Sequence, residues 1–133
     1  MSFVTWSDDY SIENERLDDH HKLLFELINR LGRGIADNNN ALLELEVLTQ
    51  LENYAMTHFI YEEIYMLDIS YKDMEDHIAQ HNLFRAKVGE LRQLYCGVGE
   101  AGKQEVIEYL KKWAENHIVT EDNKIAQWKR LNS

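Results

Sequence analysis

The sequence predicts an all-α protein: an antiparallel up-down-up-down four-helix bundle with an N-terminal arm and a short C-terminal helix. Apolar residues recur every three or four positions in four long segments, which is the pattern of helices that each bury one face. The chain of 133 residues contains no proline and only 6 glycines, so little interrupts those segments. The connections between them are short, and short connections make consecutive helices antiparallel neighbours in one domain.

The elements follow in order along the chain. Residues 1–16 show no helical period and are expected to lie on the bundle as an arm, through side chains such as Trp6 and Tyr10. A helix over 17–36 is predicted by a stripe of core positions at alternating spacings of four and three: Leu17, His21, Leu24, Ile28, Leu31 and Ile35. The other predicted helices cover 41–66, 73–95, 103–119 and 121–130.

The last helix is the least regular. His117 and Asp122 are five residues apart, so on a straight α-helix their side chains diverge by about 140°. If both reach one site, the helix is expected to break between them, near Val119 to Glu121. Thr120 is a suitable N-cap for a new short helix after that break.

Composition excludes several classes of partner. The formal net charge of -10 argues against nucleic acid and against an anionic membrane surface. No apolar run approaches the roughly 18 residues of a membrane span, and the N-terminus carries no secretory signal pattern. A single cysteine, Cys96, excludes an intramolecular disulfide and fits a reducing compartment, so a cytoplasmic location is expected.

Five of the 6 histidines fall on predicted core stripes. His58 and Glu62 are one helical turn apart on a face that is otherwise apolar, with Leu51, Ala55 and Phe59. Buried ionisable groups cost several kcal/mol, in order of magnitude, unless they are paired, and a metal ion would satisfy both side chains. The predicted metal ligands are His21, His58, Glu62, His77, His81, His117 and Asp122.

The spacing of these residues also matches known motifs. The chain contains DxxH at 18–21, HFxxEE at 58–63, HxxxH at 77–81, and WxxxHI at 113–118 followed by Asp122. Together these motifs resemble the hemerythrin family, in its single-domain bacterial form, the bacteriohemerythrins. The resemblance covers nearly the whole chain, 1–133, as a single hemerythrin-like domain.

The resemblance implies a non-haem centre of two iron ions with an oxo or hydroxo bridge. His77, His81 and His117 would hold one iron, and His21 and His58 the other, which keeps an open position. Glu62 and Asp122 would bridge the two ions. Dioxygen would bind reversibly, for oxygen storage, delivery or sensing, and small anions such as azide would bind too.

Other functions remain open at this point. The same ligands could serve an enzyme, namely a di-iron oxidase, a peroxidase or a nitric oxide reductase, or an iron-binding protein with no oxygen role. Five neutral imidazoles with only two carboxylates stabilise high-valent iron less than carboxylate-rich sites do, which favours oxygen binding without enzymatic turnover. The oligomeric state is not predicted, and a monomer is compatible with the sequence.

Four residues pose separate questions. His20 stands where the family usually has glutamine, and is expected to be solvated or to support a ligand rather than to be one. Ala114 and Ile125 replace the usual leucine and tyrosine, which leaves either an open route to the site or compensated packing. Glu63 is either an acceptor for a ligand N–H or a surface carboxylate.

The metal-free state is a further expectation. Glu62 and Asp122 would then be two acids facing each other in an apolar core. Burial and like charge are both expected to raise the pKa of such carboxyl groups, and so to loosen the segment after His117.

Overall fold

The computed structural model describes residues 4–37, 41–95 and 100–132, and in these it confirms the predicted four-helix bundle, with no strand. A short 3-10 turn, η1 (Asp8–Tyr10), precedes the bundle. The helices are α1 (Glu15–Ala36), α2 (Ala41–Asp68), α3 (Met74–Leu94), α4 (Glu100–Trp113), the π-helical η3 (Ala114–Glu121) and α5 (Asp122–Leu131). Residues 96–99, which follow the predicted helix over 73–95, lie outside the described residues.

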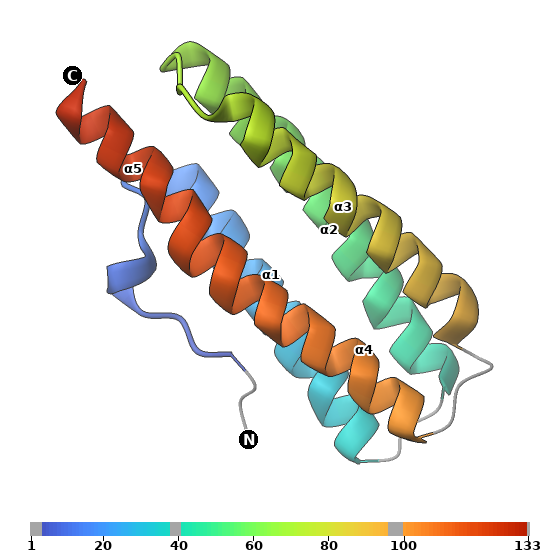
Figure 1. The fold of residues 1–133 in the computed structure, drawn as a ribbon. Coiled ribbons are helices and arrows are strands. Elements are labelled where there is room, and N and C mark those ends of the chain that lie inside the picture. The colour runs from blue at the N-terminus through green and yellow to red at the C-terminus, as the bar shows by residue number, and fades with distance from the viewer. Residues whose placement is uncertain (1–3, 38–40, 96–99, 133) are drawn as a thin grey trace.

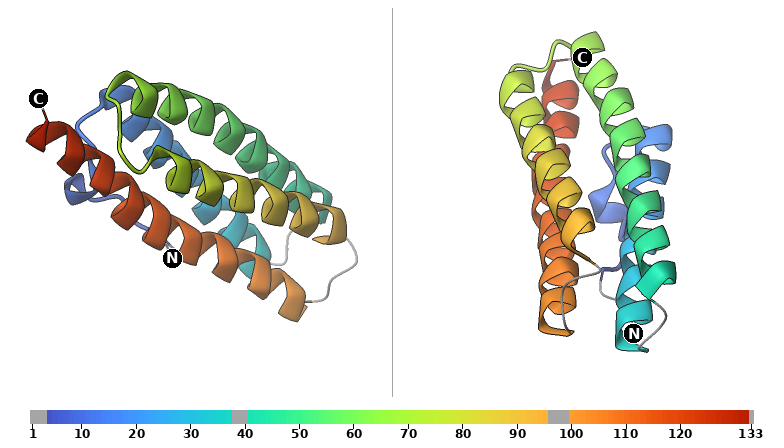
Figure 2. Two further views of the ribbon diagram at one scale, coloured as in Figure 1. Left: turned by 45° about the horizontal axis from the view of Figure 1, so that its top comes forward. Right: turned by 90° about the vertical axis from the view of Figure 1, so that its right-hand side faces the viewer.

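The long helices lie side by side and alternate in direction (Figure 1). α1 packs on α2 and on α4, and α2 packs on α3. The connection from α2 to α3 and the C-terminus lie at the same end of the bundle, as both views in Figure 2 show. Over the described ranges, none of the helices combines the length and the apolar character needed to cross a membrane.

The N-terminal arm lies along the bundle, as predicted. The Val4 backbone N–H donates to Asn29 Oδ1 at 2.8 Å, and Asn29 Nδ2 donates to the Val4 carbonyl at 2.7 Å. The ring of Trp6 meets Phe25 edge-on, at 6.0 Å between centroids. Asp18, the first residue of the DxxH motif, accepts from the Ile12 backbone N–H at 2.9 Å. Its role is therefore to hold the arm against α1.

The start of α1 is set by a side-chain cap. Asn14 Oδ1 accepts from the Leu17 backbone N–H at 3.1 Å, which satisfies one of the free N–H groups of the first turn. The helix therefore begins at Glu15, two residues before the predicted start. Every residue of the predicted stripe is buried: Leu17, His21, Leu24, Ile28, Leu31 and Ile35.

The core is divided along the bundle axis. A large apolar cluster includes Leu31, Leu51, Val88 and Leu110, each from a different long helix. Two small clusters lie apart from it. One contains Ile12, Leu17 and Ala126, and the other contains Met66, Tyr71 and Ile125.

The predicted break near Val119 to Glu121 is wrong. α4, η3 and α5 form one continuous helical rod (Figure 1). Glu121 is helical and makes no side-chain cap, and the Asp122 backbone N–H donates to the His117 carbonyl, five residues back. This i→i+5 bond widens the turn, so residues five apart lie above one another. The structure therefore aligns His117 with Asp122 by widening the helix and not by breaking it.

A pair of alanine substitutions tests this difference. Thr120→Ala should change the free energy of unfolding by less than about 0.5 kcal/mol, because Thr120 is exposed and caps nothing. Asn14→Ala should cost about 1 kcal/mol, because Asn14 caps α1. Urea unfolding of both variants measures this, and a loss of about 1 kcal/mol in Thr120→Ala would contradict the continuous helix.

Candidate metal centre

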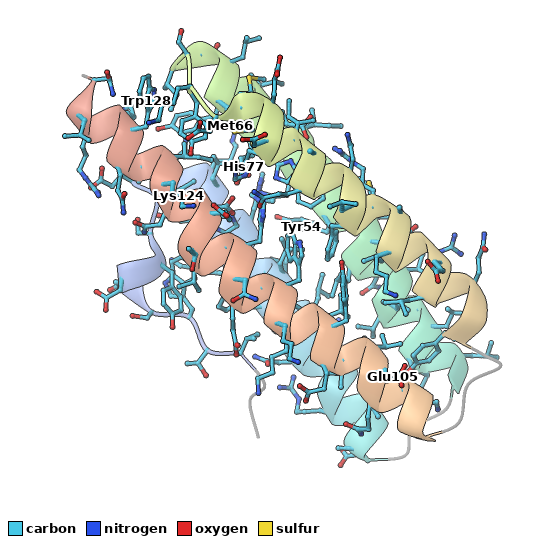
Figure 3. The ribbon with its side chains drawn as sticks, viewed as in Figure 1. Tyr54, Met66, His77, Glu105, Lys124 and Trp128 are labelled. Carbon is cyan, nitrogen blue, oxygen red and sulfur yellow. The ribbon has the colours of Figure 1, made fainter. Side chains whose placement is uncertain are left out.

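The structure brings all seven predicted residues together in the bundle interior. They come from five helical segments, α1, α2, α3, η3 and α5, and none is more than 4% exposed. Figure 3 shows one of them, His77, between α3 and the C-terminal rod. Their side-chain nitrogen and oxygen atoms form two groups, in each of which the atoms lie within 4.8 Å of one another.

The larger group contains three histidines and both carboxylates: Glu62, His77, His81, His117 and Asp122. Glu62 Oε1 lies 2.7 Å from His77 Nε2 and 3.0 Å from His81 Nε2. Asp122 Oδ1 lies 2.9 Å from His77 Nε2 and 3.2 Å from His117 Nε2. Three imidazole nitrogens therefore surround one oxygen from each carboxylate.

The smaller group contains two histidines and the same carboxylates: His21, His58, Glu62 and Asp122. Here the other two oxygens are used. Asp122 Oδ2 lies 3.0 Å from His21 Nε2, and Glu62 Oε2 lies 3.3 Å from His58 Nε2. Each carboxylate thus offers one oxygen to each group, which is the arrangement needed to bridge two cations.

Four of these atoms are buried without a hydrogen-bond partner in the described part of the chain: Glu62 Oε2, His117 Nε2, Asp122 Oδ1 and Asp122 Oδ2. The Nε2 atoms of His21 and His58 also face each other at 3.0 Å. Lone pairs that converge in a water-free interior are costly unless a proton or a cation lies between them. Imidazole nitrogen and carboxylate oxygen are both ligands of transition metals, so the donor set fits a metal centre.

The pKa values of Glu62 and Asp122 are shifted in the direction opposite to the one expected from the sequence. Burial raises the pKa of Glu62, but the imidazoles of His21, His58, His77 and His81 that face the carboxylate outweigh burial and hold the pKa well below its usual value. For Asp122, burial and the charge of Glu62 raise the pKa, but His117 and His21 hold it below its usual value. The prediction of raised carboxyl pKa values is therefore wrong, because every carboxylate oxygen faces an imidazole.

The pKa values of the buried histidines are shifted in opposite directions. Burial lowers the pKa of His21 and of His77, but the facing carboxylates of Asp122 and Glu62 outweigh it and raise the two pKa values to about 9 and about 10. At His58 burial dominates, and the pKa falls to about 4. Without metal, protons on His21 and His77 therefore take over part of the charge compensation that the carboxylates need.

A second set of contacts fixes the outer nitrogen, Nδ1, of two of the histidines. His81 Nδ1 lies 2.8 Å from Glu63 Oε2, and Arg85 lies 3.3 Å from the same oxygen. His117 Nδ1 lies 2.9 Å from Gln80 Oε1. Because the Nε2 atoms point into the cluster, the Nδ1–H groups donate outward, and such acceptors hold a ligand ring in place. Glu63 is thus an acceptor, which settles the choice left open by the sequence.

Sequence reasoning missed Gln80. It directly precedes His81 on α3, yet it serves His117 on a different helix. Only the packing of α3 against η3 brings the amide to that ring, and no spacing within α3 signals it. Two further rings fix the histidine planes: Phe59 stacks on His81 at 3.9 Å and Trp113 stacks on His117 at 4.7 Å between centroids.

Ala114 and Ile125 are both fully buried. Ala114 belongs to the large apolar cluster, and Ile125 packs with Met66 and Tyr71. The groove that reaches His117, with a volume of about 480 Å³, is lined by Trp113 and Asn116 and not by Ala114. The structure therefore favours compensated packing over an open route.

Known proteins resemble this chain over most of its length. The family profile described as the Hemerythrin HHE cation binding domain matches residues 13–128. The bacteriohemerythrin of Pseudomonas aeruginosa (strain LESB58) is 32% identical over 122 residues, which cover 92% of this chain and 78% of that protein. The bacteriohemerythrin of Clostridium acetobutylicum is 26% identical over 88% of this chain and 94% of its own.

Solved structures agree with these matches. A crystal structure of a mutant hemerythrin superposes with a TM-score of 0.84 at 26% identity, and the match covers 96% of this chain and 98% of the other. The sequence matches, the shared fold and the buried His/Glu/Asp cluster together support a metal centre at this site.

The packing of Ala114 gives a stability prediction. Ala114→Leu adds three carbons to a filled core and should lower the free energy of unfolding by about 1–3 kcal/mol. Ala86→Leu, the same change at an exposed position of α3, should leave stability within about 0.5 kcal/mol of wild type. Chemical denaturation of both variants decides the point. An Ala114→Leu protein as stable as Ala86→Leu would show that space is free beside Ala114.

Gln80 gives a prediction about metal affinity. Gln80→Leu removes the acceptor for His117 Nδ1–H and should weaken metal binding by about 10-fold or more. Gln80→Glu keeps an acceptor oxygen and should bind close to wild type. Competition between each protein and a chelator for Co²⁺ measures the affinities. Equal binding by the Leu variant and wild type would mean that the Gln80 contact does not support the site.

Proposed function

Because this chain belongs to the hemerythrin family, we propose that its buried cluster holds two iron ions and binds dioxygen reversibly. The observation that carries the proposal is the division of the two carboxylates. Glu62 and Asp122 each direct one oxygen toward a three-histidine group and the other toward a two-histidine group. A site for a single ion would not need two sets of imidazoles that share two bridging carboxylates.

The chain's own residues divide the roles between them. His77, His81 and His117 would hold one iron, His21 and His58 would hold the other, and Glu62 and Asp122 would bind both. The two-histidine position has one protein ligand fewer, which leaves room there for dioxygen or for a small anion such as azide. Two adjacent iron ions supply reversible two-electron exchange with dioxygen.

The surroundings support binding without turnover. Five neutral imidazoles and only two carboxylates make the donor set poor in negative charge, which disfavours the high-valent iron that oxidation of a substrate needs. Phe59 and Trp113 stack their aromatic faces on His81 and His117 and hold the planes of those two rings. The protein is therefore proposed to be an oxygen-binding protein and not an oxidase or peroxidase.

Metal analysis and visible spectroscopy test the proposal together. Protein isolated with ample iron should contain about two irons per chain, and a spectrum formed in air should fade when oxygen is removed and return when it is readmitted. Azide should compete for the same position. A reproducible single zinc per chain, or steady consumption of reductant with oxygen, would contradict the proposed function.

A matched pair of variants tests whether the iron is bound by the cluster. Asp122→Ala removes one oxygen from each metal position and should lose most of the iron. Glu115→Ala removes an exposed carboxylate from the same helical rod and should keep the wild-type iron content. If both variants kept their iron, Asp122 would not be a ligand.

A further inference from the structure

His20 lies beside the cluster and is not one of its members. It neighbours His21 on α1, and its Nδ1 lies 3.1 Å from Nδ1 of His58 on α2. Its ring meets the ring of His58 edge-on, at 5.3 Å between centroids and an interplanar angle of 88°. The contact therefore joins two different helices at the outer side of a proposed iron ligand.

The ring of His20 is held in place by two tyrosines of α2. Tyr54 lies 5.5 Å away at 85°, and Tyr61 lies 5.4 Å away at 61°, both edge-on. Tyr54 is labelled in Figure 3, on the part of α2 that precedes the cluster. These two neighbouring rings restrict the rotation of the imidazole, so its Nδ1 stays directed at His58.

The ring nitrogen of His58 that carries the proton decides whether His58 donates or accepts the hydrogen bond with His20. Its Nε2 points into the cluster, 3.0 Å from His21 Nε2 and 3.3 Å from Glu62 Oε2. If Nε2 binds a metal ion, the proton of a neutral imidazole must be on Nδ1, and that N–H needs an acceptor. The only partner that the structure gives to His58 Nδ1 within the described chain is His20 Nδ1.

We propose that His20 is a positioning residue of the metal centre, which accepts a hydrogen bond from His58 Nδ1–H and so fixes the tautomer and direction of that ring. This inference rests on the proposed function. His20 does for His58 what Glu63 does for His81 and Gln80 does for His117. One site thus uses an imidazole, a carboxylate and an amide as its outer acceptors.

The two-histidine position depends most on this contact. Among the described residues, Nδ1 of its other histidine, His21, has no hydrogen-bond partner. The three-histidine position, in contrast, has acceptors at two of its rings, His81 and His117. Loss of the His20 acceptor should therefore weaken the two-histidine position first and leave the other ion in place.

Two substitutions of His20 distinguish the loss of its hydrogen-bond acceptor from the loss of its side-chain volume. His20→Leu keeps an apolar side chain of similar reach but accepts no hydrogen bond. His20→Gln restores an acceptor, since an amide oxygen already fills this role at His117. Both changes are made at a partly exposed position, so the bundle should fold in each case.

The first measurement is the release of iron from the loaded protein to a chelator. In His20→Leu one of the two ions should leave about 10-fold faster than in wild type or more, with the second ion unchanged. His20→Gln should behave as wild type. Equal rates in all three proteins, or the same acceleration in Leu and Gln variants, would overturn the proposal.

The second measurement does not depend on iron. In protein loaded with Zn²⁺, the Nδ1–H proton of His58 should give a solvent-protected NMR resonance in wild type and in His20→Gln, and should lose that protection in His20→Leu. Protection that persists in the Leu variant would refute the contact. If wild-type protein bound no iron but showed this zinc result, the proposed function would fail while the role of His20 would stand.

Discussion

Two carboxylates buried among five imidazoles are the constraint around which the described bundle is arranged. Glu62 and Asp122 are fully buried, and every one of their oxygens faces a histidine nitrogen at 2.7–3.3 Å. Such a cluster stabilises the fold only when positive charge lies within it, because uncompensated buried carboxylates oppose folding. Metal ions supply that charge in the proposed function, and protons on His21 and His77 supply part of it otherwise. Folding and metal binding are therefore coupled at the same atoms.

The π-helical segment η3 is the change in helix geometry that brings Asp122 into that cluster. An ordinary α-helix would carry Asp122 away from His117, and the i→i+5 bond from Asp122 N–H to the His117 carbonyl restores the alignment. π-helical turns are rare, appear mostly as single turns inside α-helices, and occur frequently at functional sites. Here the segment lies in the continuous rod from α4 to α5, where the packing of Ala114 and Ile118 on one side and Ile125 on the other holds it.

The sequence was sufficient for the fold and for the identity of the cluster residues, because both depend on periodicity within single helices. The stripe from Leu17 to Ile35 is buried as its spacing predicted. The irregular spacing from His117 to Asp122 was also visible, but spacing alone does not tell a break from a widened turn. That choice depends on packing on both sides of the segment.

Properties that depend on contacts between helices could not be predicted from the sequence. The sign of the carboxyl pKa shifts depends on which nitrogen each oxygen faces, and this is fixed only when four helices meet. Gln80 serves a histidine on another helical segment, so no periodicity within its own helix reveals it. For His20 the sequence left two roles open, a solvated side chain or support of a ligand, and only the packing of α1 on α2 brings it to His58. Glu63 shows the same limit, since its position beside Glu62 suited both a surface role and the contact with His81.

The division of the core explains how a polar site is tolerated in so small a bundle. The large apolar cluster, with Leu51, Val88 and Leu110, lies on one side of the histidines along the axis, and it needs no metal to bury its surface. The two small clusters, around Leu17 and Met66, close the other side. Apolar packing on both sides buries the seven cluster residues, and contacts between polar groups are stronger in such a low-dielectric interior than in water. The bundle thus buries most of its apolar surface in one half, and this allows the other half to hold a cluster of ionisable side chains.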